Sequence, residues 1–201
     1  MGLAETDLGL IVSLAAVTYT IAVPIWGRMS DRIGRVKVIY IGLIAYALAT
    51  IAFAYVMHLG MTGVLLAPAS LILLIGIRMS LTIGSGGVHP GATAFMADIT
   101  ETSQRAAGVA MVGAAFGLGA IAGPVLAGFL SVYGLLFPIY ASAVVAGLLG
   151  VLIAVKVREP ERATTKDADR MGMLDPQIRS FFLLALIAFT TVAIIQQTSA
   201  F

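Results

Sequence analysis

The sequence predicts an all-α bundle of helices that cross a membrane several times. Of its 201 residues, 60% are hydrophobic and only 11% are charged, a composition too apolar for a water-soluble domain of this length. The uncharged runs are about 20 residues long or longer, the length that a helix needs to span about 30 Å of hydrocarbon. They lack alternating polarity and are about twice as long as barrel strands, so they do not fit a β-barrel.

Six spans are predicted from the charged stretches and from the turns between them. A basic stretch at 27–37 separates the first two spans. Turns without Lys or Arg, near 58–63 and 131–134, each divide a long apolar stretch into two helices. The predicted helices cover 8–28, 37–57, 68–98, 105–130, 135–156 and 179–201.

The Lys and Arg residues orient these spans. All but one of the 12 lie in or beside loops that the positive-inside rule assigns to the cytoplasm. The stretches 28–37 and 156–179 then share one side, so an even number of spans separates them and 38–97 holds two helices rather than three. Both ends of the chain are predicted outside. This arrangement accounts for the net charge of +2 without a nucleic-acid partner.

The sequence also argues against several kinds of chemistry. It has no cysteine, so it forms no disulfide and no thiolate metal site, and we predict neither a metal nor a cofactor. It contains no H-E-x-x-H or G-x-S-G motif and no paired intramembrane aspartates, which disfavours an enzyme. The N-terminus carries Glu5 and Asp7 in place of a basic segment, so we do not expect a cleaved signal peptide.

The basic stretch carries the most specific motif. It reads GRMSDRIGRVK and resembles the loop between the second and third helices of the major facilitator superfamily, G-x-x-x-D-R-x-G-R-[KR]. A merely basic loop would need neither the two glycines nor the aspartate. The matching residues are Gly27, Asp31, Arg32, Gly34 and Arg35, while the next cation is displaced from Val36 to Lys37.

The resemblance implies that this stretch is a gating loop. Asp31 would face the N-terminus of a helix in the other half of a transporter, where the helix dipole favours a carboxylate. Asp98, at the cytoplasmic end of the third predicted span, would pair with Arg35 and hold an inner gate shut. The alternative is that Asp98 is an ordinary acid at the membrane surface.

Arg78 is the one cation that falls inside a span. Insertion scales assign a central arginine a cost of about 2.5–3.5 kcal/mol, so such a residue is a functional-site hypothesis. At 100° per residue, Arg78, Thr82, Ser85 and His89 fall within about 30° of a common helix face. The alternative is an arginine whose side chain reaches the outer interface.

This segment resembles the fourth-helix pattern of the same superfamily, R-x-x-Q-G-x-G-x-G. Arg78, Gly84 and Gly86 match, whereas Leu81 and Thr82 replace the glutamine and glycine. The resemblance implies a role for Arg78 in proton coupling. His89 is a candidate proton carrier, because histidine titrates near neutrality, or it is simply hydrogen-bonded within the bundle.

The span 105–130 is rich in glycine and contains a proline. Small residues let helices approach closely in lipid, and a proline inside a span frees a carbonyl and kinks the helix. The segment resembles the antiporter motif of the superfamily, G-x8-G-x3-G-P-x2-G-G, with alanine at two glycine positions. The matching residues are Gly119, Gly123, Pro124 and Gly128. The motif is typical of proton-driven exporters, while helix packing alone is the other interpretation.

Together these matches predict a major facilitator chain that runs from the second to the seventh helix. Residues 1–157 would form part of the N-terminal half, 158–178 a cytoplasmic central loop, and 179–201 the first helix of the C-terminal half. In that last helix Gln196 and Gln197 would contact substrate in a central cavity or hydrogen-bond a neighbouring helix. The expected partners are the lipid bilayer, a small-molecule substrate, protons and the missing remainder of the transporter.

The predicted function is secondary active transport of small molecules, as proton-coupled export of drugs or metabolites across a bacterial inner membrane. The alternatives are a sugar or organic-acid proton symporter of the same superfamily and a membrane scaffold that transports nothing.

Overall fold

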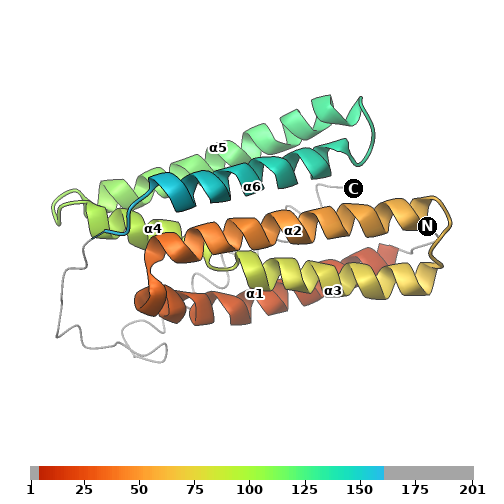
Figure 1. The fold of residues 1–201 in the computed structure, drawn as a ribbon, viewed down its shortest axis with the longest axis horizontal. Coiled ribbons are helices and arrows are strands. Elements are labelled where there is room, and N and C mark those ends of the chain that lie inside the picture. Colours follow the sequence, from red (N-terminus) through yellow and green to blue (C-terminus); the bar gives the residue numbers. More distant parts are fainter. Residues whose placement is uncertain (1–4, 161–201) are drawn as a thin grey trace. The chain divides into compact units, whose positions relative to one another are not determined.

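The computed structural model describes residues 5–160, which belong to one compact unit, Met1–Arg162. The described residues are helical throughout their regular structure, as the sequence predicts (Figure 1). The helices are α1 (Glu5–Ile33), α2 (Arg35–Met61), α3 (Ala67–Ser85), α4 (Val88–Ile99), α5 (Arg105–Ser131) and α6 (Phe137–Lys156).

Five stretches of the described residues are long and apolar enough to cross a membrane, and they match the first five predicted spans. They are Gly9–Ile33, Arg35–Met61, Pro68–Ile99, Arg105–Ser131 and Phe137–Lys156. The sixth predicted span, with Gln196 and Gln197, lies outside the described residues, as does nearly all of the predicted central loop. The division into two transporter halves therefore stays a prediction.

The basic stretch is not the open loop that the sequence suggested. Helix α1 continues to Ile33 and α2 begins at Arg35, so Gly34 alone connects them. Gly34 has a φ of 118°, which an L side chain rarely adopts, and this lets the chain reverse in one residue. The helices extend past the apolar run because polar residues outside the hydrocarbon remain compatible with helical backbone.

The prediction of one continuous helix over 68–98 is also wrong, because the structure divides this span into α3 and α4. The break lies at Gly86 and Gly87, four and three residues before Pro90. Proline has no N–H to donate to the carbonyl of Gly86, and its ring clashes with that carbonyl in a regular helix. The two glycines add to the effect, since glycine favours helix less than any residue except proline.

Helix α2 packs on both sides through small residues. Figure 1 shows α5 and α6 on one side of α2, and α1 and α3 on the other. A Cβ atom added to Gly84 of α3 would lie 2.7 Å from the Cβ of Ala45, and one added to Gly150 of α6 would lie 3.0 Å from Cγ1 of Ile44. Close approach of this kind stabilises helix pairs in lipid, where dispersion replaces the hydrophobic effect.

The opposite situation holds for α5, whose side chains are mostly exposed. Gly108 is its one buried residue, while Phe116, Ile121 and Phe129 are each at least two-thirds exposed. A surface this apolar suits contact with lipid or with other helices rather than with water.

Candidate gate at the ends of α1, α2 and α4

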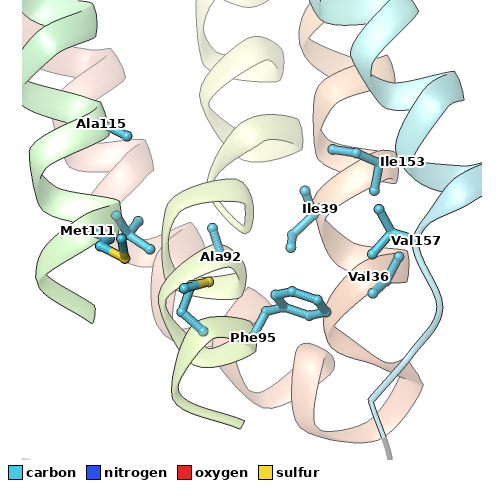
Figure 2. A pocket seen from close by; sticks show the side chains of 10 residues that line it. Val36, Ile39, Ala92, Phe95, Met111, Ala115, Ile153 and Val157 are labelled. Atoms are coloured by element: carbon cyan, nitrogen blue, oxygen red, sulfur yellow. The ribbon is translucent and has the colours of Figure 1, made fainter. Parts of the chain in front are cut away.

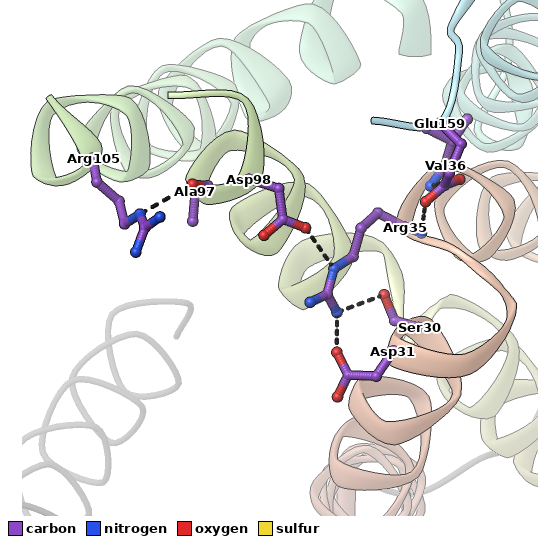
Figure 3. A network of polar contacts seen from close by, with 8 residues as sticks. All are labelled: Ser30, Asp31, Arg35, Val36, Ala97, Asp98, Arg105 and Glu159. Atoms are coloured by element: carbon purple, nitrogen blue, oxygen red, sulfur yellow. Dashed lines mark hydrogen bonds and ion pairs between the residues drawn. The ribbon is translucent and has the colours of Figure 1, made fainter. Parts of the chain in front are cut away.

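The sharp turn at Gly34 brings the last turn of α1 against the first residue of α2. As a result Arg35 faces Asp31, four residues earlier, and Asp98 near the end of α4. The Arg35 Nε donates to Asp98 Oδ2 at 3.0 Å, and its Nη1 donates to Asp31 Oδ1 at 2.5 Å (Figure 3). One guanidinium thus links three helices.

The same Nη1 atom also donates to the hydroxyl of Ser30 at 3.2 Å. Ser30 is buried at 2% exposure, whereas the side chains of Asp31 and Asp98 are 64% and 35% exposed. The guanidinium therefore lies between a buried hydroxyl and two carboxylates that water can reach. Exposed ion pairs contribute about 0–1 kcal/mol each, so the network is one that can open and close again.

Glu159, which the sequence analysis did not single out, completes the site. It follows α6, and its carboxylate accepts the backbone N–H of Arg35 and, at 3.0 Å, that of Val36. Helix α2 has no capping side chain and no acid in its first turn, so Glu159 supplies both the acceptor and the negative charge that a helix N-terminus favours. The one sequence feature that points to a distant cap such as Glu159 is that α2 has no capping residue of its own.

Besides allowing the unusual backbone angle, Gly34 leaves room beside it for the Glu159 side chain. A Cβ added to it would lie 2.7 Å from both Cδ and Oε2 of Glu159, too close for any real contact. The carboxylate therefore occupies the space that a side chain at position 34 would take.

The other members of the motif make no such contacts among the described residues. A Cβ added to Gly27 would meet no atom within 4 Å, and Arg32 is exposed. On the other side of Asp98, Arg105 at the start of α5 donates through Nε to the carbonyl of Ala97 at 3.1 Å (Figure 3). That cation at the C-terminal end of α4 complements the helix dipole and holds α5 against α4.

The polar stripe predicted from Arg78 to His89 is interrupted by the break in the span, which divides its members between α3 and α4. Thr82 Oγ1 donates to the carbonyl of Arg78 at 2.8 Å, and Ser85 Oγ donates to that of Leu81 at 2.8 Å. Both hydroxyls therefore satisfy their own helix. Arg78 is half-buried, and within residues 5–160 its guanidinium forms no ion pair.

His89 lies on the other side of the break, in α4. It is exposed, and its ring meets that of Phe116 edge to face at 5.4 Å. The structure therefore groups His89 with α5 and leaves Arg78, Thr82 and Ser85 on α3.

Within the described part of the chain, open space lies beside the glycines of the motif in α5. A Cβ added to Gly119, Gly123 or Gly128 would meet no atom within 4 Å. Pro124 lies inside α5 and does not end it. The role of these four residues stays a prediction.

An apolar cavity of about 400 Å³ lies beside the gate, where α2, α4, α5 and the end of α6 meet (Figure 2). Val36, the residue after Arg35, lines the cavity, as do Phe95 and Met96 of α4. The ten lining residues are Val36, Ile39, Ala92, Phe95, Met96, Met111, Val112, Ala115, Ile153 and Val157. A cavity with this lining suits hydrocarbon rather than an ion.

The described residues include no group of three or more His, Cys, Asp or Glu that suits a metal ion.

Comparison with known proteins gives a consistent result. The family model of the Major Facilitator Superfamily matches residues 1–201. Multidrug resistance protein 1 of Bacillus subtilis (strain 168) is 32% identical over 192 residues, which are 96% of this chain and 46% of that protein. Quinolone resistance protein NorA of Staphylococcus aureus is 29% identical over 181 residues, 89% of this chain and 42% of that protein. The chain thus spans less than half the length of these relatives.

Proposed function

Because this chain belongs to the major facilitator superfamily, a family of membrane transporters, we propose that it works as part of a secondary transporter that exports small molecules. With five apolar helices of spanning length in its described part and bacterial relatives, it is an integral membrane protein of the bacterial plasma membrane. We propose further that export is driven by protons and that the chain is no enzyme.

The observation that carries the proposal is the network around Arg35. A transporter that alternates its access needs a contact at one membrane face that holds a closed state without trapping it. Because the Arg35 side chain is only 21% exposed, each ion pair is taken in the upper half of the range of about 0–1 kcal/mol, so the two contribute together about 1–2 kcal/mol. Since 1.4 kcal/mol corresponds to a tenfold change in an equilibrium constant, breaking the network would shift the balance between closed and open states about 5- to 30-fold.

Arg78 is the proposed coupling residue, and the names of the relatives guide the choice of substrate. An arginine inside a span without an ion-pair partner among residues 5–160 is a candidate to bind an acidic group of a proton-linked site or of a substrate. One relative is named for resistance to many drugs and the other for resistance to quinolones. We therefore propose a drug-like, largely apolar substrate.

Transport by everted membrane vesicles that contain the full-length protein tests this function. A proton gradient, acid inside, should drive accumulation of a fluoroquinolone, and a protonophore should release it. Arg35→Ala should slow uptake about 5- to 30-fold by the estimate above. Lys37→Ala, which removes a nearby exposed cation outside the network, should transport at the normal rate.

Accumulation of a sugar or organic acid by right-side-out vesicles, with no movement of fluoroquinolone in everted ones, would favour the symporter alternative. Equal rates in Arg35→Ala and Lys37→Ala would show that the network is no gate.

A further inference from the structure

The break between α3 and α4 leaves a backbone carbonyl without its regular partner. In a continuous helix the carbonyl of Ile83 would accept the N–H of Gly87, four residues later. Here α3 ends at Ser85, and the backbone hydrogen bonds of the described residues include none from Gly87 to Ile83. Within a membrane such a carbonyl needs another donor.

Trp26 of α1 provides that donor. Its indole Nε1 donates to the carbonyl O of Ile83 at 2.5 Å, across 57 residues of sequence. Trp26 is also the one tryptophan in the chain. The contact therefore joins α1 to the last turn of α3, where the span changes direction.

The two glycines of the break also pack closely against the Trp26 indole. A Cβ added to Gly87 would lie 3.0 Å from Cγ of Trp26 and 2.5 Å from Cγ1 of the fully buried Val38. One added to Gly86 would lie 3.4 Å from Cδ1 of Trp26. The ring thus fills the space beside the break, and its N–H binds the carbonyl that the break exposes.

From these contacts we propose that Trp26 is a positioning residue, which sets the angle between α3 and α4 and so places Asp98 against Arg35. Asp98 lies in the last turn of α4, whose 12 residues extend about 18 Å at 1.5 Å per residue. A change of about 20° at the break would move that end by about 6 Å. The 3.0 Å contact between Arg35 and Asp98 would then be lost.

Distances between spin labels test the angle without reference to transport. Labels on cysteines at Ile72 of α3 and Ile99 of α4, both exposed, would lie about 40 Å apart on a straight helix. The chain has no cysteine of its own, and any elsewhere in the full-length protein would be replaced. Trp26→Phe retains a ring against the glycines and removes the N–H.

We expect Trp26→Phe to shift or widen the distance distribution by about 1–3 Å, because a change of about 20° between two arms of about 20 Å alters their end-to-end distance less than it displaces the end of α4. Tyr19→Phe is the matched control, since it removes a polar group from an exposed ring on α1, and it should leave the distribution unchanged. Benzothienylalanine at position 26, which retains the bicyclic shape without an N–H, should reproduce Trp26→Phe even if phenylalanine disturbs folding. A distribution like that of the unsubstituted protein in the benzothienylalanine variant would overturn the proposal.

Transport gives a second readout, which rests on the proposed function. Trp26→Phe should lower the maximal rate about three- to tenfold, as expected for one lost hydrogen bond, with the KM unchanged. Added to Asp98→Asn it should cause no further loss, because both act on the same ion pair. Additive losses would contradict the proposal. If no substrate is moved at all, the proposed function fails while the spin-label distances still decide the role of Trp26.

Discussion

Substitution of Gly34 offers the sharpest test of how the gate is built, because two separate costs meet at this residue. Alanine at a φ of 118° would be strained by about 1–3 kcal/mol. Its Cβ would also displace the Glu159 carboxylate, which lies 2.7 Å away, and loss of a helix cap costs about 1–2 kcal/mol. Gly34→Ala should therefore destabilise the protein by about 2–5 kcal/mol in total.

Glu159→Ala removes the cap alone and should cost about 1–2 kcal/mol. In the double variant the cap is lost only once, so the combined cost should fall short of the sum by about 1–2 kcal/mol. Unfolding of the full-length protein in mixed detergent and SDS gives each free energy.

The matched control is Gly134→Ala. Gly134 also has a positive φ, 142°, but no atom lies within 4 Å of an added Cβ. Its cost should be strain alone and should add to that of Glu159→Ala without coupling. Strict additivity between Gly34→Ala and Glu159→Ala would refute the reasoning, since it would mean that the carboxylate does not occupy the space beside Gly34.

Three further predictions concern topology and transport in the full-length protein. A cysteine at Lys37 should label only from the cytoplasm and one at Thr62 only from outside, because they lie at opposite ends of α2; labelling of both from one face would contradict the orientation. Arg78→Ala should abolish proton-coupled transport while insertion, measured by membrane abundance, is unchanged or higher; normal proton-driven uptake would leave a side chain that reaches the interface as the better explanation. Asp31→Asn should slow transport several-fold, since it removes one charge of the network, with substrate affinity measured at equilibrium unchanged; weaker affinity at normal turnover would argue against a gating role.

The first five spans were predictable because length and hydropathy define a membrane helix from local sequence alone. The break at Gly86 and Gly87 was predictable too, since Pro90 stands four residues after Gly86, but a long apolar run suggested one helix. Extension of α1 to Ile33 was missed, because a charged stretch was interpreted as a loop although helices continue into the interface.

Contacts between distant residues were harder to predict. The pairing of Arg35 with Asp98 followed from a motif resemblance, which carries information that hydropathy lacks. Glu159 belongs to no motif that we recognised and reaches α2 across 123 residues, so nothing in its own neighbourhood marks it. The same holds for Trp26, whose partner is a backbone carbonyl that only the fold exposes.

The cap on α2 cannot form until most of the chain has been synthesised, because its two partners, Arg35 and Glu159, are far apart in the sequence. Ribosomes add about 5–20 residues per second, so the 124 residues between Arg35 and Glu159 take about 6–25 s to make. During that interval α2 and then α4 are made, and the first amides of α2 face only water or lipid headgroups. The cap on α2 therefore forms last, once the end of α6 has left the ribosome, and a chain stopped before Glu159 would lack it.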